Sequence, residues 1–253
     1  MMKNLHAVII AGGFALFFLA GLFAAGSLNP GSSAEIDRDL LYQVSTYTSL
    51  SGGGYDPVEP ARILMKNGDL GLGTFTGLDG EMVVVDGTCY QVKSDGNARP
   101  ADLSLGVPFA GVTFFSSDLA VPGVSAGNMT ELTGFLDSRL PSKDLFYAIR
   151  IDGTFPYIKA RSPPAQDKPY PPLADALKRQ SIYEFRNVTG TAVGFYTPSS
   201  AAGLSFPGYH LHFITADRSR GGHILDITTG GNTVELDPTP RSLTILTPER
   251  AGS

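Results

Sequence analysis

Three of the four histidines of this 253-residue chain, His210, His212 and His223, lie in the stretch GYHLHFITADRSRGGHILD. Side chains two residues apart on a β-strand point to the same face. A strand over residues 209–215 therefore places His210 and His212 side by side. A bend followed by a second strand brings His223 next to them. Three neutral imidazoles with one open position are typical of a catalytic metal site, most often a zinc site.

A simpler interpretation is a polar histidine pair on a strand with His223 in a turn, because short motifs also match by chance. The metal site is favoured because a return strand over residues 223–227 gives His223 a reason to lie near the pair. Asp217 and Asp226 lie in the same stretch. They are either hydrogen-bond partners that orient the imidazoles or turn-forming aspartates, and the sequence leaves both readings open.

The composition indicates which elements must position these histidines. The chain is 42% hydrophobic and 17% charged, with 30 glycines and 18 prolines, which is typical of a strand-rich and turn-rich globular protein. We predict an α+β fold that is predominantly antiparallel β, built as a two-layer, two-subdomain β architecture with a few short helices. The proline-rich residues 162–172 mark a possible subdomain boundary.

Asp-Gly steps between apolar runs predict hairpins, because glycine accepts the positive φ that tight turns require. Such steps occur at residues 79–80, 86–87 and 152–153, and the last predicts a hairpin between strands 145–151 and 154–161. Further strands are predicted at residues 40–50, 111–116, 182–185, 189–196, 222–228, 233–237 and 243–246. Helices are predicted at residues 60–66, 130–140 (with a capping pair, Asn128 and Glu131) and 173–180.

The N-terminus resembles a targeting segment. Residues 1–26 combine Lys3 with an apolar run over residues 7–25 that ends in small residues. This pattern predicts a cleaved signal peptide, with an uncleaved membrane anchor as the alternative. Residues 27–39 then form a linker and residues 40–253 the catalytic domain, which we expect outside the cytoplasm in either case. Cys89 is the only cysteine, so no internal disulfide is possible.

Several partner classes are excluded or unsupported. The net charge of −5 and the lack of a basic cluster argue against a nucleic-acid partner. No glycine-rich dinucleotide fingerprint or P-loop is present, so no organic cofactor is expected. We expect a small-molecule substrate, membrane contact only through an uncleaved anchor, and either a monomer or a homodimer.

A series of short motifs runs through the chain. They are Gly-Leu-Gly-Thr-Phe at 71–75, Leu-Asp-Gly-Glu at 78–81, Asp-Gly-Thr-Cys-Tyr-Gln at 86–91, Phe-Tyr-Ala-Ile at 146–149, Gln-Asp-Lys-Pro-Tyr at 166–170, Gly-Thr-Ala-Val-Gly at 190–194, and the histidine stretch itself. Together they are far more specific than His-x-His alone. On these motifs the chain resembles the α-acetolactate decarboxylase family, over nearly all of residues 40–248.

The resemblance implies a zinc-dependent enzyme that converts (S)-2-acetolactate to (R)-acetoin and CO₂. The family's three zinc ligands correspond to His210, His212 and His223. Its active-site glutamate and arginine correspond to Glu81 and Arg161. The family commonly carries a second glutamate on a longer C-terminal tail. Glu249 is the only carboxylate in the tail of this chain, and the sequence leaves open whether it replaces that glutamate.

The implied chemistry is a decarboxylation in which zinc acts as a Lewis acid for the enediolate left after loss of CO₂. Arg161 then binds the substrate carboxylate or donates a hydrogen bond near it. Arg161 and Glu81 are both candidates for delivering the proton. Two alternatives remain: another three-histidine metalloenzyme on a β-scaffold, such as a cupin-like enzyme, and an extracytoplasmic protein that binds a metal or ligand without turnover.

Overall fold

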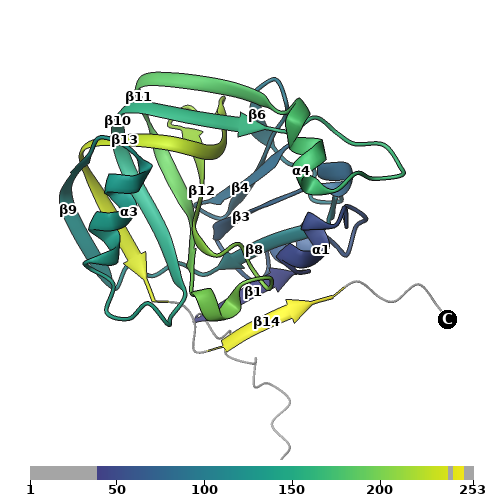
Figure 1. Cartoon of the computed structure of the whole chain (residues 1–253), viewed down its shortest axis with the longest axis horizontal. Helices are drawn as coiled ribbons and strands as arrows, with labels where there is room; N and C mark the ends of the chain where they lie inside the picture. Colours follow the sequence, from purple (N-terminus) through teal and green to yellow (C-terminus); the bar gives the residue numbers. More distant parts are fainter. Residues whose placement is uncertain (1–38, 239–241, 248–253) are drawn as a thin grey trace, which may run out of the picture. The chain divides into compact units, whose positions relative to one another are not determined.

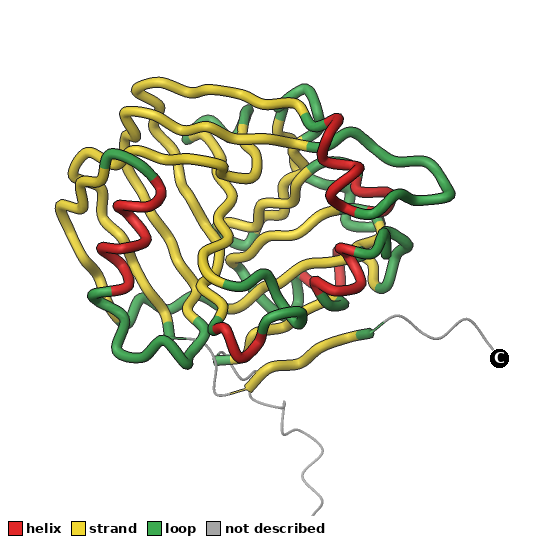
Figure 2. The backbone as a smooth tube through the Cα atoms, in the orientation of Figure 1, coloured by secondary structure: helices red, strands yellow, loops and turns green. Residues whose placement is uncertain are grey.

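Two large β-sheets and one small two-stranded pair form the described part of the chain, residues 39–238 and 242–247, in a computed structural model (Figures 1 and 2). All strand pairs described are antiparallel except one, and the helices are short (Figure 2). The predicted fold class, predominantly antiparallel β with a few short helices, is confirmed. The leader at residues 1–26 and Glu249 lie outside the described residues. Within them, no helix has the length and apolar character needed to cross a membrane.

The first sheet has seven strands and contains the confirmed hairpin around residues 86–87. Its strands, in spatial order, are β14 (Ser242–Leu246), β1 (Leu40–Val44), β8 (Phe109–Thr113), β3 (Leu70–Thr74), β4 (Glu81–Val85), β5 (Thr88–Val92) and β6 (Ala98–Pro100). Asp86 and Gly87 join β4 to β5 with φ angles of 53° and 70°. Two successive positive φ angles match the right-handed strand twist. The separate pair is β2 (Glu59–Pro60) with β7 (Gly106–Val107).

The second sheet has five strands, three of them unusually long. Its order is β10 (Tyr147–Ser162), β11 (Ser181–Thr197), β12 (Gly208–Thr215), β13 (Gly221–Asp237) and β9 (Leu119–Ala126). A further pairing between β10 and β13 closes four of these strands into a ring. Figure 1 shows the long strands curving over the molecule. The curvature gives the sheet an enclosed inner face that apolar side chains fill, most of them leucine, isoleucine, phenylalanine and tyrosine.

The hairpin predicted at residues 152–153 is wrong, because β10 continues through Asp152 and Gly153 without reversing. Gly153 has a φ of 133°, which bends the strand. Asn232 donates a hydrogen bond from its side chain to the Asp152 carbonyl (3.2 Å), in place of a turn bond. Both halves of β10 pair with β11, which runs past the bend on the same side. The Asp-Gly step therefore serves strand curvature here.

Two other predictions of separate strands were wrong for the same reason. Residues 182–185 and 189–196 join in β11 through Asn187, and residues 222–228 and 233–237 join in β13 through Gly231. Both linking residues have positive φ, 49° and 91°, and absorb the bend. The strand predicted over residues 40–50 is also too long. It ends at Val44, and a short helix follows.

The helices lie on the surface of the sheets. They are α1 (Tyr47–Ser51), α2 (Ala61–Leu64), α3 (Met129–Asp137) and α4 (Leu173–Ala176), with 3-10 turns η1 (Thr76–Leu78), η2 (Leu177–Arg179) and η3 (Ser199–Ala201). The predicted cap of α3 is confirmed: the Asn128 side chain accepts a hydrogen bond from the Glu131 backbone N–H at 2.9 Å. Residues 163–180, which include α4 and η2, are called the strap below.

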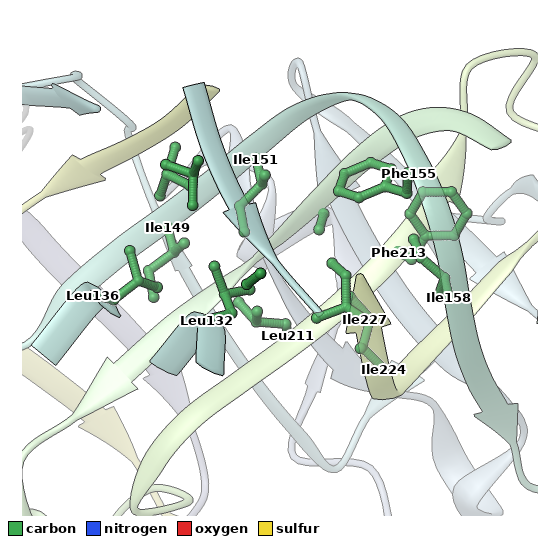
Figure 3. Close-up of a cluster of buried hydrophobic side chains, with 14 of the residues drawn as sticks. Leu132, Leu136, Ile149, Ile151, Phe155, Ile158, Leu211, Phe213, Ile224 and Ile227 are labelled. Carbon is green, nitrogen blue, oxygen red and sulfur yellow. The ribbon is translucent and has the colours of Figure 1, made fainter. Parts of the chain in front are cut away.

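Two buried clusters hold the sheets in place. The larger lies inside the curved second sheet, where α3 contributes Leu132 and Leu136 (Figure 3). The second lies between the sheets and joins Leu72 and Val83 of the first to Phe195 and Ile214 of the second. Burying side chains of this size contributes about 1.5–3 kcal/mol each. The second cluster therefore fixes how strands β3 and β4 face strands β11 and β12, and the histidines of β12 lie at this junction.

Candidate metal centre and active site

The three histidines converge at the junction of the two sheets. His210 and His212 lie on β12, and His223 lies on β13 directly opposite His212 in the strand register. The Nε2 atom of His210 is 3.2 Å from Nε2 of His212 and 3.1 Å from Nδ1 of His223. One ring nitrogen from each residue lies within 4.8 Å of the others. The sequence predicted that a second strand returns beside the first, and the register of that pair sets His223 against His212.

The chemistry of the cluster fits a metal ion. His212 uses Nδ1 to donate a hydrogen bond to the Met82 carbonyl (2.8 Å), which leaves Nε2 free to act as a ligand. Burial lowers the pKa of His212 to about 3, and the pKa values of His210 and His223 are also well below the usual range because of burial and neighbouring positive charge. Neutral imidazoles are the form that binds metals. Imidazole ligands suit zinc, copper, iron and nickel.

Glu81 and Arg161 lie beside the histidines although they are far from them in the sequence. Arg161 is on β10, opposite His223 of β13, and Glu81 begins β4 in the other sheet. Glu81 Oε2 is 3.6 Å from His212 Nε2, and Glu81 Oε1 is 3.6 Å from Arg161 Nη1. Both side chains are mostly buried, with 8% of the glutamate and 13% of the arginine exposed. The structure thus brings all five predicted site residues to one place.

The pKa of the buried Glu81 carboxyl lies near neutral pH. Burial raises its pKa to about 7, while the positive charge of Arg161 opposes the rise. A carboxyl group with a pKa in this range changes protonation state at small energetic cost near neutral pH. Glu81 is therefore chemically suited to hold or release a proton.

One cavity of about 140 Å³ connects these groups. Its polar half consists of the three histidines, Glu81, Arg161 and Thr74. Thr74 ends β3 and lies opposite Glu81 in the β3–β4 pair, and its hydroxyl donates to the Gly80 carbonyl at 2.7 Å. A small cavity with a few convergent polar groups is typical of a site for a small ligand.

The rest of the cavity lining is apolar. Leu78 and Phe109 contribute to it from the buried core. The residues called the apolar wall below come from other segments: Tyr47 and Leu50 of α1, Leu173 and Leu177 of the strap, and Phe206. Phe206 packs edge-on against Tyr47 (ring centroids 5.4 Å apart) and against the ring of His210 (5.3 Å). The cavity lining therefore combines charged groups and ligand nitrogens with hydrocarbon.

Neither aspartate near the histidines contacts an imidazole. Asp217 accepts hydrogen bonds from Thr215 and Ser219, which shape the β12–β13 turn. Asp226 accepts from the Met129 backbone N–H at the start of α3. The turn-forming interpretation holds for Asp217, and Asp226 anchors a helix.

Sequence reasoning missed several groups of the site. The imidazole partner is a backbone carbonyl, that of Met82, and a carbonyl leaves no signal in residue type. Thr74 lies within one of the family motifs, and its place opposite Glu81 across a hairpin was the available signal. The apolar wall had no signal, because its residues come from three separate surface segments.

Comparison with known proteins places this arrangement in a family. The model of the family described as alpha-acetolactate decarboxylase matches residues 41–251. The alpha-acetolactate decarboxylase of Methanosarcina mazei is 52% identical over 79% of this chain and 70% of its own length. That of Bacillus subtilis is 44% identical over 78% and 77%.

Solved structures agree. The crystal structure of alpha-acetolactate decarboxylase from Bacillus subtilis strain 168 has a TM-score of 0.80 at 42% identity, covering 84% of this chain and 90% of that one. A Staphylococcus aureus protein of unknown function, described as similar to alpha-acetolactate decarboxylase, has a TM-score of 0.79 at 30% identity, with coverage of 83% and 89%. The chain therefore belongs to the α-acetolactate decarboxylase family.

Proposed function

We propose that this chain converts (S)-2-acetolactate to (R)-acetoin and CO₂, using a zinc ion held by His210, His212 and His223. The observation that supports this most strongly is the convergence of three neutral imidazoles with Glu81 and Arg161 on one small cavity. The identity of the substrate is inferred from the names of the related proteins, which are alpha-acetolactate decarboxylases. When bound, zinc supplies a Lewis acid for the enediolate that loss of CO₂ leaves.

Arg161 binds the substrate carboxylate in this proposal. Its guanidinium keeps its charge and offers two parallel N–H groups to a carboxylate. Within the cavity it is the only cationic side chain among the described lining residues. It is mostly buried, so water competes weakly for the same hydrogen bonds. Arg161 thus fixes the direction of the bond between C2 and the carboxylate, which is the bond that breaks.

Glu81 delivers the proton that completes the product. A guanidinium gives up a proton only at very high pH, whereas burial gives the Glu81 carboxyl a pKa of about 7. Glu81 lies on the opposite sheet from Arg161, so it approaches the cavity from a defined side. Delivery from one side produces a single enantiomer, as the proposed (R)-acetoin requires.

The decisive experiment supplies racemic 2-acetolactate to the purified full chain and measures acetoin and its chirality. We expect (R)-acetoin well above the spontaneous background and one zinc per chain by elemental analysis. Chelation should abolish activity, and added zinc should restore it. Acetoin formation no faster than in buffer would contradict the proposed function, and full activity after complete metal removal would contradict the role of zinc.

We also propose that the catalytic domain works outside the cytoplasm. The basis is the sequence of residues 1–26, in which a positive start precedes an apolar run and small residues. Cell fractionation with mass spectrometry of the N-terminus tests this. An intact N-terminus in the cytoplasmic fraction would contradict the proposal.

A further inference from the structure

The strap connects β10 to β11 and lines part of the cavity. It leaves β10 two residues after Arg161, passes through a proline-rich stretch, and returns to the sheet at the start of β11. On the way it contributes Leu173 and Leu177 to the apolar wall. Both side chains are partly buried, and both belong to helical turns of three or four residues. Such short helices need tertiary contacts to hold their position.

Gln166 supplies those contacts from a buried position, 5% exposed. Its side-chain oxygen accepts a hydrogen bond from Arg179 Nη2 at 2.5 Å, which ties the start of the strap to its end. Its side-chain nitrogen donates to the Pro164 carbonyl at 2.6 Å. Its backbone N–H donates to the Gly77 carbonyl of η1 at 2.7 Å. The pair Gln166 and Arg179 is called the clip below.

The clip is separate from the anchoring of Arg161. Arg161 is paired on both sides, with Ile182 of β11 and His223 of β13. Ser162 follows it and donates a hydrogen bond to the Val92 carbonyl at 2.8 Å. A loosened clip therefore shifts the leucines of the strap while Arg161 keeps its place in the sheet.

The two halves of the cavity determine how a substrate lies in it. The oxygen atoms of a 2-hydroxy-3-keto acid are satisfied only on the polar half, by the ligand site, Glu81 and Arg161. Its alkyl groups then face the apolar wall. Leu50, Leu78 and Phe109 are fixed in the buried core. Among the partly buried apolar residues of the lining, Leu173 and Leu177 belong to the strap, so the strap contributes to the space available to the alkyl groups.

We propose that Leu173 and Leu177 determine which alkyl size the enzyme accepts, and that the clip is the positioning device that keeps them against the substrate. The inference rests on the proposed function for its substrate class. It assigns the strap a role in specificity in addition to the chemistry of the histidines, Glu81 and Arg161.

The test compares 2-acetolactate with its homologue 2-aceto-2-hydroxybutyrate, in which an ethyl group replaces the methyl group on C2. The measured quantity is the kcat/KM of the homologue divided by that of acetolactate. A pocket typically discriminates one methylene by 10- to 200-fold. We expect Leu177→Ala and Leu173→Ala to raise the ratio about tenfold, and Leu177→Phe to lower it.

Variants of the clip test whether Gln166 and Arg179 position the strap leucines, as distinct from a general loss of stability. Gln166→Ala and Arg179→Ala should each raise the ratio. The double variant should raise it no further than Gln166→Ala alone, because Gln166→Ala already removes the hydrogen bond to Arg179. Lys178→Ala is the matched control, since Lys178 lies between Leu177 and Arg179, pairs with Asp175 and does not line the cavity. It should leave the ratio unchanged.

A binding measurement keeps the inference separate from the proposed reaction. Calorimetry on the zinc-loaded full chain compares two unreactive acids, 2-hydroxy-2-methylpropanoate and 2-ethyl-2-hydroxybutanoate. Leu177→Ala should favour the larger acid relative to the parent chain. If the parent chain forms no acetoin but this shift occurs, the proposed reaction fails and the role of the strap stands. If folded Leu173→Ala and Leu177→Phe variants leave both the kinetic and the binding ratios unchanged within twofold, the inference is overturned.

Discussion

The two halves of the cavity are built in different ways. The polar half comes from strands of both sheets, where Thr74, Glu81, Arg161 and His223 each have a fixed partner in the register. The apolar wall comes from α1, the strap and the segment around Phe206, which a few hydrogen bonds hold. Groups that require sub-ångström placement are on strands, and groups that only fill space are on short helices and loops.

This difference has an energetic basis. Displacing a strand residue such as His212 breaks ladder hydrogen bonds and uncovers the buried cluster between the sheets. Displacing Leu177 breaks far fewer contacts. Local opening therefore costs less on the wall than on the polar half. We expect changes on strands to affect chemistry strongly, and changes on the wall to affect binding and stability modestly.

The largest expected effect follows from His212→Ala. The substitution removes one ligand nitrogen of the proposed zinc site and the hydrogen bond to the Met82 carbonyl. Since Lewis acid stabilisation contributes several kcal/mol, we expect acetoin formation to fall about 10³-fold or more. Zinc content should fall with it. Elemental analysis and a turnover assay check both, with circular dichroism as the folding control; a metal-free variant of full activity would contradict the assignment.

A smaller effect is expected from Arg161→Lys, which keeps the charge and loses the paired N–H groups. Charged hydrogen bonds contribute about 1.5–3 kcal/mol, so kcat/KM should fall about 10- to 100-fold. Zinc content should not change, because Arg161 is not a ligand in the proposed site. Parent turnover in this variant would show that Arg161 does not bind the carboxylate.

Asp237 tests whether the far end of β13 is independent of the site at its start. Asp237 is 5% exposed, and burial raises its pKa to about 6, although the Ser116 N–H donates to it at 2.8 Å. A carboxyl whose folded pKa exceeds its unfolded value stabilises the fold below about pH 4. This stabilisation is lost as the pH rises to about 6, and amounts to about 1–3 kcal/mol.

In Asp237→Asn this loss should be absent. Urea unfolding of both proteins at pH 4, 5, 6 and 7 gives the free energy of unfolding at each pH. The free energy of the variant should exceed that of the parent by an amount that grows as the pH rises. Zinc affinity should be the same in both proteins, because Asp237 is not among the cavity residues. A difference in unfolding free energy that shrinks as the pH rises would contradict a raised pKa for Asp237.

The smallest effect comes from two matched helix caps. Thr46 accepts a hydrogen bond from the Ser49 N–H (3.1 Å) at the start of α1, which belongs to the wall, and Asn128 caps α3, which does not. Replacing either with alanine should cost about 1 kcal/mol of unfolding free energy. Only Thr46→Ala should also raise the KM for acetolactate. Equal KM values in the two variants would show that α1 does not shape the wall.

Local patterns predicted some elements well and others poorly. The Asp86-Gly87 turn and the Asn128 cap depend on residues a few positions apart, so the sequence predicted them correctly. The Asp152-Gly153 step carries the same local signal, but β11 pairs with both sides of it and Asn232 occupies the place where a turn would close. Long-range pairing outweighed turn propensity there.

The sequence alone determined the chemical groups of this protein and their short-range spacing: two histidines two residues apart, a third after a bend, and motifs that mark Glu81 and Arg161. Only the tertiary structure decided that a β4 residue and a β10 residue meet the histidines, that the Met82 carbonyl accepts a hydrogen bond from His212, and that strap leucines line the cavity. These contacts join residues up to 131 positions apart, as for Glu81 and His212. They depend on sheet packing, which no local pattern encodes.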